Sequence, residues 1–321
     1  MVNFSPDKDI PDLSGKVILI TGANVGLGRE SLHQLAKHNP RTIYLAARSK
    51  AKADQTIKEI NDTLPDTAQS TIRFLECDLT SFDSIKKAAK TFTSESDRLD
   101  ILMNNAGIMA CPEGLTNEGY EVQFGTNHVG HSLLIKLLLP TLQKTAKDAP
   151  TGSVRIVNLS SAGEQLAPKP DGIKFDSLKT PNSGGLSTWT RYGQSKLANV
   201  LYARALAKRY PEIVSVSVHP GVVQTELTRG PLASYGSWLY YPTKIMAALF
   251  CKSVAQGALN QTWAAVAPVA KQEGGQGVKN GTFYHPVGVA GKDSGLAKDE
   301  HDVLSDKLWE WTEKELKGQE L

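Results

Sequence analysis

A tyrosine and a lysine stand four positions apart in the segment Tyr192-Gly-Gln-Ser-Lys196. Side chains with this spacing face the same side of a helix. A free tyrosine has a pKa of about 10, too high for easy proton exchange near neutral pH. A nearby ammonium group favours the phenolate and lowers that pKa. The pair could therefore act as a general acid or base, although an ordinary pair on a helix surface has the same pattern.

A glycine-rich loop, Ile20-Thr-Gly-Ala-Asn-Val-Gly-Leu-Gly28, follows an apolar run and precedes a helical pattern. Gly22 permits a tight turn, Gly26 lets a pyrophosphate approach the backbone, and Gly28 lets the helix pack closely on its strand. The helix N-terminus adds unpaired N–H groups and a dipole that favours phosphate. The loop predicts a dinucleotide site, with an ordinary glycine-rich turn as the alternative.

Short β-branched runs alternate with helical patterns and must position these residues. Strands are expected at 16–20, 42–46, 71–76, 99–103, 154–159 and 214–218, and helices at 29–38, 49–62, 81–92, 120–143, 191–209 and 302–316. The fourth of these helices is expected to be interrupted or to end near Pro140.

This alternation is typical of a parallel sheet with helices on both faces. We expect an α/β fold with a single Rossmann-type, doubly wound parallel sheet of about seven strands. One domain would span residues 1–321, with its core at about 15–225 and a substrate lid and C-terminal cap at about 226–321.

The composition excludes several classes of function. The chain has 36 basic and 33 acidic residues and a net charge of +3, too balanced to predict binding to nucleic acid or to an acidic membrane. Its three cysteines lie far apart and predict free thiols in a reducing compartment. The sequence shows neither a signal peptide nor a transmembrane run, so a cytoplasmic protein is expected.

Five motifs together resemble the short-chain dehydrogenase/reductase family. In chain order they are the glycine loop as TGxxxGxG, Asn104–Gly107 as NNAG, the serines Ser160 and Ser161 at the end of the fifth strand, Tyr192–Lys196 as YxxxK, and Pro220-Gly221. One such motif is weak evidence, whereas five in order and at similar spacing are specific. They cover about residues 15–225.

The chain is further similar to the branch that includes retinol dehydrogenases. Asn127–His131 and Ser195–Asn199 resemble stretches of that branch. The segment between Ser161 and Tyr192, whose inserted part is 164–190, is longer than in simpler members. A substrate does not follow from this likeness, because a shared fold does not transfer a substrate.

The resemblance implies a catalytic group. Tyr192 would exchange a proton with the substrate oxygen, and Lys196 would lower the pKa of Tyr192 and bond the nicotinamide ribose. A serine would polarise the carbonyl. Ser160 and Ser161 both compete for this role, and the family pattern favours Ser161.

Asn127 resembles the family's helix asparagine, which helps to hold a water chain for proton relay. A helix-packing amide is the alternative. His128 and His131 are three positions apart, but two histidines without further ligands do not make a metal site. No metal is expected.

The end of the second strand indicates the coenzyme. Ala46-Ala-Arg-Ser49 has no acidic residue to bond the ribose 2′-hydroxyl of NAD. Arg48 can pair with a 2′-phosphate, and Asn24 and Ser49 can add hydrogen bonds. NADP(H) is therefore expected, with a solvated surface arginine as the alternative. With the family positions added, the expected cofactor-binding residues are Gly22, Asn24, Gly26, Leu27, Gly28, Arg48, Ser49, Asp78, Leu79, Asn105, Ala106, Gly107, Tyr192, Lys196, Pro220, Gly221, Val223 and Thr225.

Residues 237–250, SWLYYPTKIMAALF, follow Pro220-Gly221 where the family builds its substrate lid. Their side chains suit a bulky lipophilic or aromatic substrate; a core helix or a membrane-surface anchor are alternatives. The expected function is NADP(H)-dependent reduction of a carbonyl or oxidation of the matching alcohol. A non-catalytic NADP(H)-binding sensor or scaffold, and a lyase or epimerase with tightly held NAD, are the alternatives. Members of the resembled family are commonly dimers or tetramers through helices equivalent to 120–139 and 191–209. The long C-terminal third could block a tetramer face, so a monomer or homodimer is expected.

Overall fold

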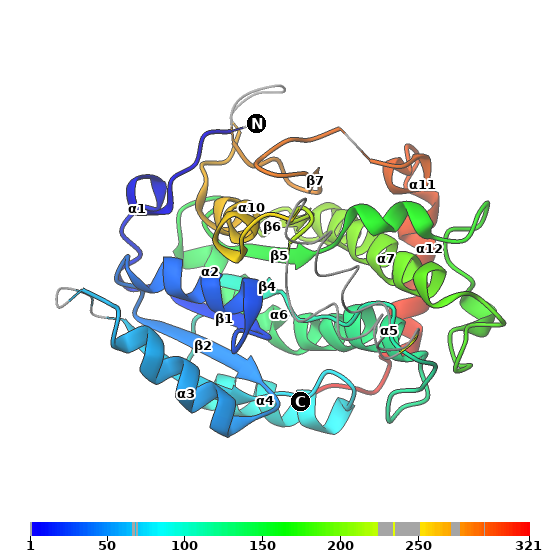
Figure 1. The fold of residues 1–321 in the computed structure, drawn as a ribbon, viewed down its shortest axis with the longest axis horizontal. Helices are drawn as coiled ribbons and strands as arrows, with labels where there is room; N and C mark the ends of the chain where they lie inside the picture. Colours follow the sequence, from blue (N-terminus) through cyan, green and yellow to red (C-terminus); the bar gives the residue numbers. More distant parts are fainter. Residues whose placement is uncertain are drawn as a thin grey trace.

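The centre of the molecule is a parallel sheet of seven strands in the order β3-β2-β1-β4-β5-β6-β7 (Figure 1). The computed structural model describes residues 2–65, 68, 70–223, 234, 251–270, 277–291 and 293–321. The strands are β1 Val17–Thr21, β2 Thr42–Ala47, β3 Thr71–Glu76, β4 Ile101–Asn104, β5 Arg155–Leu159, β6 Val214–Val218 and β7 Phe283–Tyr284. The predicted doubly wound parallel sheet is confirmed.

Burial explains why the strand sequences are so apolar. Every residue of β1, β4, β5 and β6 is buried, because helices cover both faces of a parallel sheet. The chain adds β2 and β3 on one side of β1 and β4 to β7 on the other, so the strand order reverses between β1 and β4. These two neighbouring strands are paired, with Ile18 opposite Ile101. In such sheets ligands bind beyond the carboxyl ends of the strands at this switch point.

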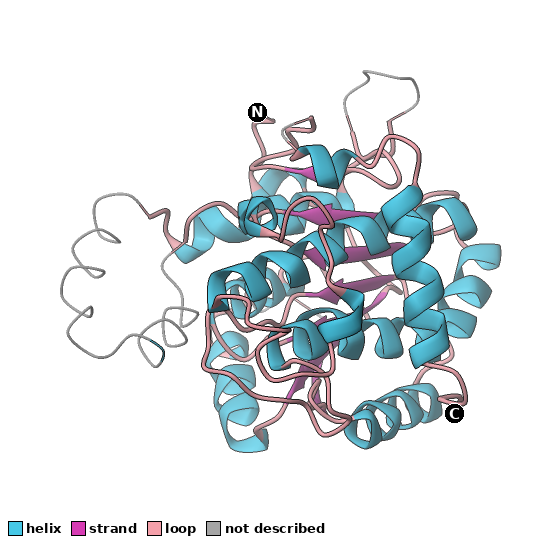
Figure 2. Cartoon of the chain, turned by 90° about the vertical axis from the view of Figure 1, so that its right-hand side faces the viewer, coloured by secondary structure: helices cyan, strands magenta, loops and turns pink. Residues whose placement is uncertain are grey.

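Helices pack on both faces of the sheet (Figures 1 and 2). One apolar layer includes side chains of α2 (Gly26–Ala36), α3 (Lys50–Asn61) and α10 (Val254–Val266). The other includes side chains of α4 (Phe82–Glu95), α6 (Gly130–Asp148) and α7 (Thr188–Arg209). Short helices lie at α1 (Pro6–Asp9), α5 (Val122–Phe124) and α11 (Gly295–Lys298), with 3₁₀ turns η2 (Ala162–Leu166) and η3 (Phe175–Ser177) in the inserted segment.

The C-terminal helix α12 (Val303–Glu315) runs beside α7 (Figure 1). Leu308 is fully buried, and the Trp309 ring stacks on Tyr202 of α7 with centroids 5.3 Å apart. Arg209 of α7 and Asp306 add an ion pair of 2.8 Å. A helix thus lies where the amphipathic pattern of 302–316 predicted one, and it covers part of the outer surface of α7.

One expectation about the helices is wrong in detail. Helix α6 continues through Pro140 to Asp148, so the chain is not interrupted there. The irregular turn comes earlier, in the π-turn η1 (Gly125–Val129), where the Gly130 N–H donates to the Gly125 carbonyl. Such turns are frequent at functional sites.

One of the longer helices and one strand of the sheet were not located from the sequence. Helix α10 buries the polar residues Asn260, Gln261 and Thr262, so it lacks the apolar periodicity that marks a helix. Strand β7 has only two residues, too few to show a pattern. Among the described helices, none combines the length and the apolar character needed to cross a membrane.

Candidate active site

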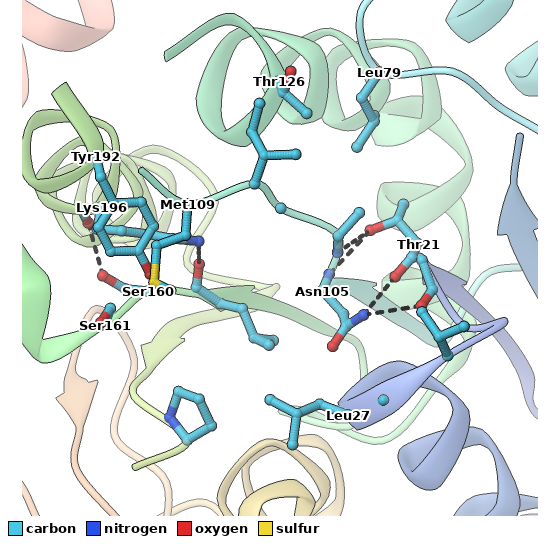
Figure 3. A pocket seen from close by; sticks show the side chains of 18 of the residues that line it. Thr21, Leu27, Leu79, Asn105, Met109, Thr126, Ser160, Ser161, Tyr192 and Lys196 are labelled. Atoms are coloured by element: carbon cyan, nitrogen blue, oxygen red, sulfur yellow. Dashed lines mark hydrogen bonds between the residues drawn. The ribbon is translucent and has the colours of Figure 1, made fainter. Parts of the chain in front are cut away.

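A cavity of about 900 Å³ lies at the switch point, beyond the carboxyl ends of β1, β2, β4 and β5 (Figure 3). This volume is at the upper end of the roughly 300–1,000 Å³ that small-molecule sites occupy. Most predicted site residues line it: Gly22, Asn24, Gly26, Leu27, Arg48, Ser49, Asp78, Leu79, Asn105, Ala106, Gly107, Ser160, Ser161, Tyr192, Lys196, Pro220, Gly221 and Val223. Gly28 and Asn127 are not part of this lining, and Thr225 lies outside the described residues.

The glycine loop forms one wall of the cavity. Gly22 and Gly26 have φ of 66° and 55°, a left-handed backbone conformation that residues other than glycine rarely adopt. A Cβ at Gly22 would lie 3.0 Å from the Ala106 Cα. A Cβ at Gly28 would lie 2.4 Å from the Asn105 Nδ2, so Gly28 permits close packing behind the loop and does not face the cavity. With the first turn of α2 in the wall, these features fit a dinucleotide pyrophosphate.

The end of β2 adds positive charge to the same cavity. Arg48 is exposed, and Ser49 begins α3 by accepting a hydrogen bond from the Lys52 N–H at 3.4 Å. Lys52 also lines the cavity. Sequence reasoning missed it, although its place one turn after Ser49 was a usable signal. The nearest acidic lining residue along the chain, Asp78, accepts hydrogen bonds from the N–H and hydroxyl of Thr80.

Helix α7 places Tyr192 and Lys196 on the same wall. The Lys196 Nζ lies 5.7 Å from the centre of the Tyr192 ring and donates to the Leu159 carbonyl at 3.0 Å. Ser160 is buried and its hydroxyl donates to the Lys196 carbonyl at 2.7 Å (Figure 3). Ser161 accepts from the Gly163 N–H at 3.0 Å. The two serines therefore have different partners.

Burial controls the protonation of this group. It raises the pKa of Tyr192 to about 12, and a hydrogen bond with Ser161 opposes that rise. Burial also lowers the pKa of Lys196 to about 8. The expectation that the pKa of Tyr192 is lowered is not met in this structure, because burial raises it and the Ser161 hydrogen bond offsets only part of the rise. Tyr192 therefore keeps its proton at neutral pH.

Asn127 lies in the π-turn η1 and is fully buried. Its Oδ1 accepts from the Ile108 N–H and its Nδ2 donates to the Ile108 carbonyl, both at 2.9 Å. The same Nδ2 lies 2.9 Å from the Ser195 Oγ. The side chain thus joins the loop after β4 to α7.

The remaining wall is apolar and comes from several parts of the chain. Met109 and Val122 line it from the loop after β4 and from α5, and Leu166 and Trp189 from the inserted segment. These residues were missed from the sequence, because no local motif marks them. The lid predicted at 237–250 lies outside the described residues.

A buried ion pair holds the inserted segment in place. Arg191 and Glu121 are 2% and 0% exposed, and their Nη1 and Oε1 atoms are 2.7 Å apart. The Arg191 Nη1 also donates to the Pro181 carbonyl, and the Glu121 carboxylate accepts from the Phe124 N–H at 2.7 Å. Arg191 directly precedes Tyr192, so the pair links the start of α7 to the start of α5.

Histidines 128 and 131 have separate partners. The His128 Nε2 lies 3.1 Å from the Thr312 Oγ1, whereas the His131 Nε2 lies 2.9 Å from the Thr21 Oγ1. The described part of the chain contains no group of three or more His, Cys, Asp or Glu side chains able to hold a metal ion.

A doubly wound sheet, a glycine loop at its switch point and a tyrosine–lysine pair on the same cavity define a dinucleotide-binding oxidoreductase fold. A family model described as short chain dehydrogenase matches residues 16–170. An uncharacterized oxidoreductase of Schizosaccharomyces pombe is 40% identical over 316 residues, which cover 95% of this chain and 86% of that protein. Retinol dehydrogenase 12 of Mus musculus is 38% identical over 258 residues, which cover 79% of this chain and 74% of that protein.

A solved structure has a similar fold. The crystal structure of an uncharacterized protein from Mycobacterium paratuberculosis matches with a TM-score of 0.71 and 26% identity, and covers 98% of this chain and 97% of that one. The chain belongs to the short-chain dehydrogenase/reductase family of oxidoreductases. The likeness to retinol dehydrogenases predicted from the motifs is confirmed.

Proposed function

We propose that the protein is an NADP(H)-dependent oxidoreductase that reduces the carbonyl of a bulky lipophilic or aromatic substrate, or oxidises the matching alcohol. The observation that carries the proposal is that Tyr192, Lys196 and Ser161 share one cavity with the glycine loop and Arg48. A bound nicotinamide would supply or accept the hydride. The chain's own residues would bind it, orient the carbonyl and move the proton.

Tyr192 would be the general acid in reduction. Its buried hydroxyl holds a proton at neutral pH, and the neighbouring Lys196 ammonium would stabilise the phenolate left after donation. Ser161 would donate to the carbonyl oxygen. We favour Ser161 over Ser160, because the Ser160 hydroxyl donates its proton to the Lys196 carbonyl. Asn127 would support the relay by holding the turn beside Lys196.

The coenzyme choice rests on charge. Arg48 and Lys52 line the cavity at the end of β2, and Ala46, Ala47 and Ser49 supply no carboxylate there. A 2′-phosphate would gain charge-assisted hydrogen bonds at this place. An NAD ribose would find no acidic partner for its 2′-hydroxyl.

The apolar wall formed by Met109, Val122, Leu166 and Trp189 supports a lipophilic or aromatic substrate. We further propose a cytoplasmic monomer or homodimer. The alternative to a cytoplasmic protein is peripheral membrane contact through residues 237–250. Sedimentation of the protein with and without lipid vesicles separates these two possibilities.

The test is coenzyme oxidation by the purified protein with NADPH or NADH against aromatic ketones, aldehydes, quinones and retinal. We expect NADPH-linked turnover that is lost in Tyr192→Phe, while NADPH binding stays within about twofold. Tyr210→Phe is the matched control, because Tyr210 lies at the end of α7 and is not among the residues that line the cavity. Tight NADPH binding without turnover on any substrate would favour a sensor or scaffold.

A further inference from the structure

A buried histidine joins the cofactor loop to the turn that carries Asn127. The His131 Nε2 lies 2.9 Å from the Thr21 Oγ1, and its Nδ1 lies 3.0 Å from the Asn127 carbonyl oxygen. We propose that His131 is a positioning residue. As the neutral Nδ1–H tautomer, it fixes the position of the cofactor-binding turn relative to the proton-transfer residues. This inference rests on the proposed function.

The partners of His131 determine its tautomer. A backbone carbonyl can only accept, so the ring must carry a hydrogen on Nδ1 to bond the Asn127 oxygen. In the neutral ring Nε2 is then an acceptor, and the Thr21 hydroxyl must donate to it. A protonated ring would place a third donor on the Thr21 oxygen and leave the hydroxyl hydrogen without its acceptor.

On the cofactor side the network holds the switch point of the sheet. With its hydrogen given to His131, the Thr21 oxygen has two lone pairs, and it accepts from the Asn105 and Ala106 N–H groups at 3.0 Å each. The Asn105 Nδ2 also donates to the Thr21 carbonyl at 2.8 Å. Every donor and acceptor of the Thr21 hydroxyl is thus used, and the ends of β1 and β4 are fixed against each other directly beside Gly22.

On the catalytic side the network reaches α7. The Asn127 Nδ2 lies 2.9 Å from the Ser195 Oγ, and this hydroxyl donates to the Tyr192 carbonyl at 2.7 Å. His131 holds the backbone carbonyl of Asn127, and the side chain of the same residue holds Ser195. Hydrogen bonds on both sides of Asn127 therefore connect Thr21 with the backbone of Tyr192.

The surroundings keep the ring neutral. Burial and the charge of Lys196 lower the pKa of His131 to about 4, and His128 is the other titratable group beside it. The bonding pattern therefore persists over the whole working pH range, so the ring can hold geometry without itself exchanging protons. This use differs from a metal ligand or a general base.

Two substitutions separate the two bonds. In His131→Asn the side-chain amide nitrogen can stand in for Nδ1 and keep the bond to Asn127, while the bond to Thr21 is lost. In His131→Gln the amide oxygen can stand in for Nε2 and keep the acceptor for Thr21, while the bond to Asn127 is lost. His131→Phe removes both.

The readouts are the Kd for NADPH, kcat, and the pH dependence of kcat/KM. For His131→Asn we expect an about tenfold higher Kd, because the buried Thr21 hydroxyl loses its acceptor and the turn beside Gly22 is no longer fixed. The pH profile should keep its wild-type pKa values. For His131→Gln we expect a Kd within twofold, an about tenfold lower kcat and a shifted pH profile. His131→Phe should show both effects.

Thr21 supplies the matched control. Thr21→Val removes the hydroxyl and should raise the Kd, whereas Thr21→Ser keeps it and should bind NADPH as the wild type does. Adding His131→Asn to Thr21→Val should raise the Kd no further, because both changes break the same bond. A full additional tenfold loss in the double variant would overturn the proposal.

A role in packing alone gives a different pattern. If the three His131 variants lose thermal stability together and change Kd and kcat in the same proportion with an unaltered pH profile, the positioning role is wrong. Failure of the proposed function is seen separately, as a wild-type protein that does not turn over with NADPH. In that case the Kd arm still tests the link between His131 and the cofactor loop.

Discussion

Removal of the Arg48 charge should change which coenzyme the protein prefers. Arg48 is exposed at the end of β2 and lines the cavity. A charge-assisted hydrogen bond is worth about 1.5–3 kcal/mol, and solvent exposure reduces an ion pair toward 1 kcal/mol or less. A bidentate contact with a doubly charged phosphate lies between these limits. We therefore expect Arg48→Ala to cost about 1–2 kcal/mol, or about 5–30-fold in the Kd for NADPH.

The assay is a fluorescence titration of NADPH and NADH at two salt concentrations. The Kd for NADH should change less than twofold, because NADH has no 2′-phosphate. The loss for NADPH should shrink at high salt, since exposed charges are screened beyond about 10 Å at 0.1 M.

Lys50→Ala is the matched control. Lys50 is an exposed cation two positions further on, pairs with Asp54 at 2.7 Å and is absent from the cavity lining. It should leave both coenzymes unaffected. The reasoning is refuted if Arg48→Ala weakens NADH as much as NADPH, or if Lys50→Ala has the same effect as Arg48→Ala.

Three further outcomes follow from the site geometry. The kcat/KM for carbonyl reduction should be constant at low pH and fall as pH rises through about 8, because Lys196 loses its charge there while Tyr192 is still protonated. The kcat/KM for alcohol oxidation should rise with pH, and pH–rate profiles of both reactions check this. Gly163→Ala should lower kcat at least tenfold with little effect on the Kd for NADPH, because the new Cβ would lie 2.9 Å from the Tyr192 ring. Arg191→Met should lower the free energy of unfolding by about 3–5 kcal/mol, as measured by denaturant titration, because it leaves the Glu121 carboxylate buried without its cation.

Matched variants separate these effects from general damage. Gly295→Ala should be silent, because its Cβ would meet nothing within 4 Å. Adding Glu121→Gln to Arg191→Met should recover part of the lost stability by removing the buried charge. A reduction rate that falls toward acid pH, or an Arg191→Met protein as stable as the wild type, would contradict the respective argument.

Local patterns in the sequence were sufficient to predict the alternating strands and helices and many of the site residues. The run from Val17 to Gly28 encodes strand, turn and helix within twelve residues by β-branching and glycine spacing. Tyr192 and Lys196 share a face through helical spacing alone. Such features depend on neighbours along the chain, so they can be read without knowing the fold. The resemblance to a family then added Asn105 and Pro220, which no local argument assigns to the cavity.

Other features depended on tertiary structure. The high pKa of Tyr192 follows from its burial, which its helix does not determine. Helix α10 was hidden because its buried face carries amides such as Gln261, whose Nε2 lies 2.6 Å from the Ser31 Oγ on α2. A polar residue is expected at the surface until the partner that satisfies it is known.

The network around His131 shows the same limit most clearly. Its sequence neighbours indicated only a pair of histidines, whereas the fold brings its ring to Thr21, 110 positions away. The sequence by itself determined strands β1 to β6, the glycine turn and the faces of the longer amphipathic helices, because these arise from short-range periodicity and backbone preference. The tertiary structure alone decided which buried polar groups meet, which of them carry a proton and which walls enclose the cavity, because those properties arise where distant segments pack and exclude water.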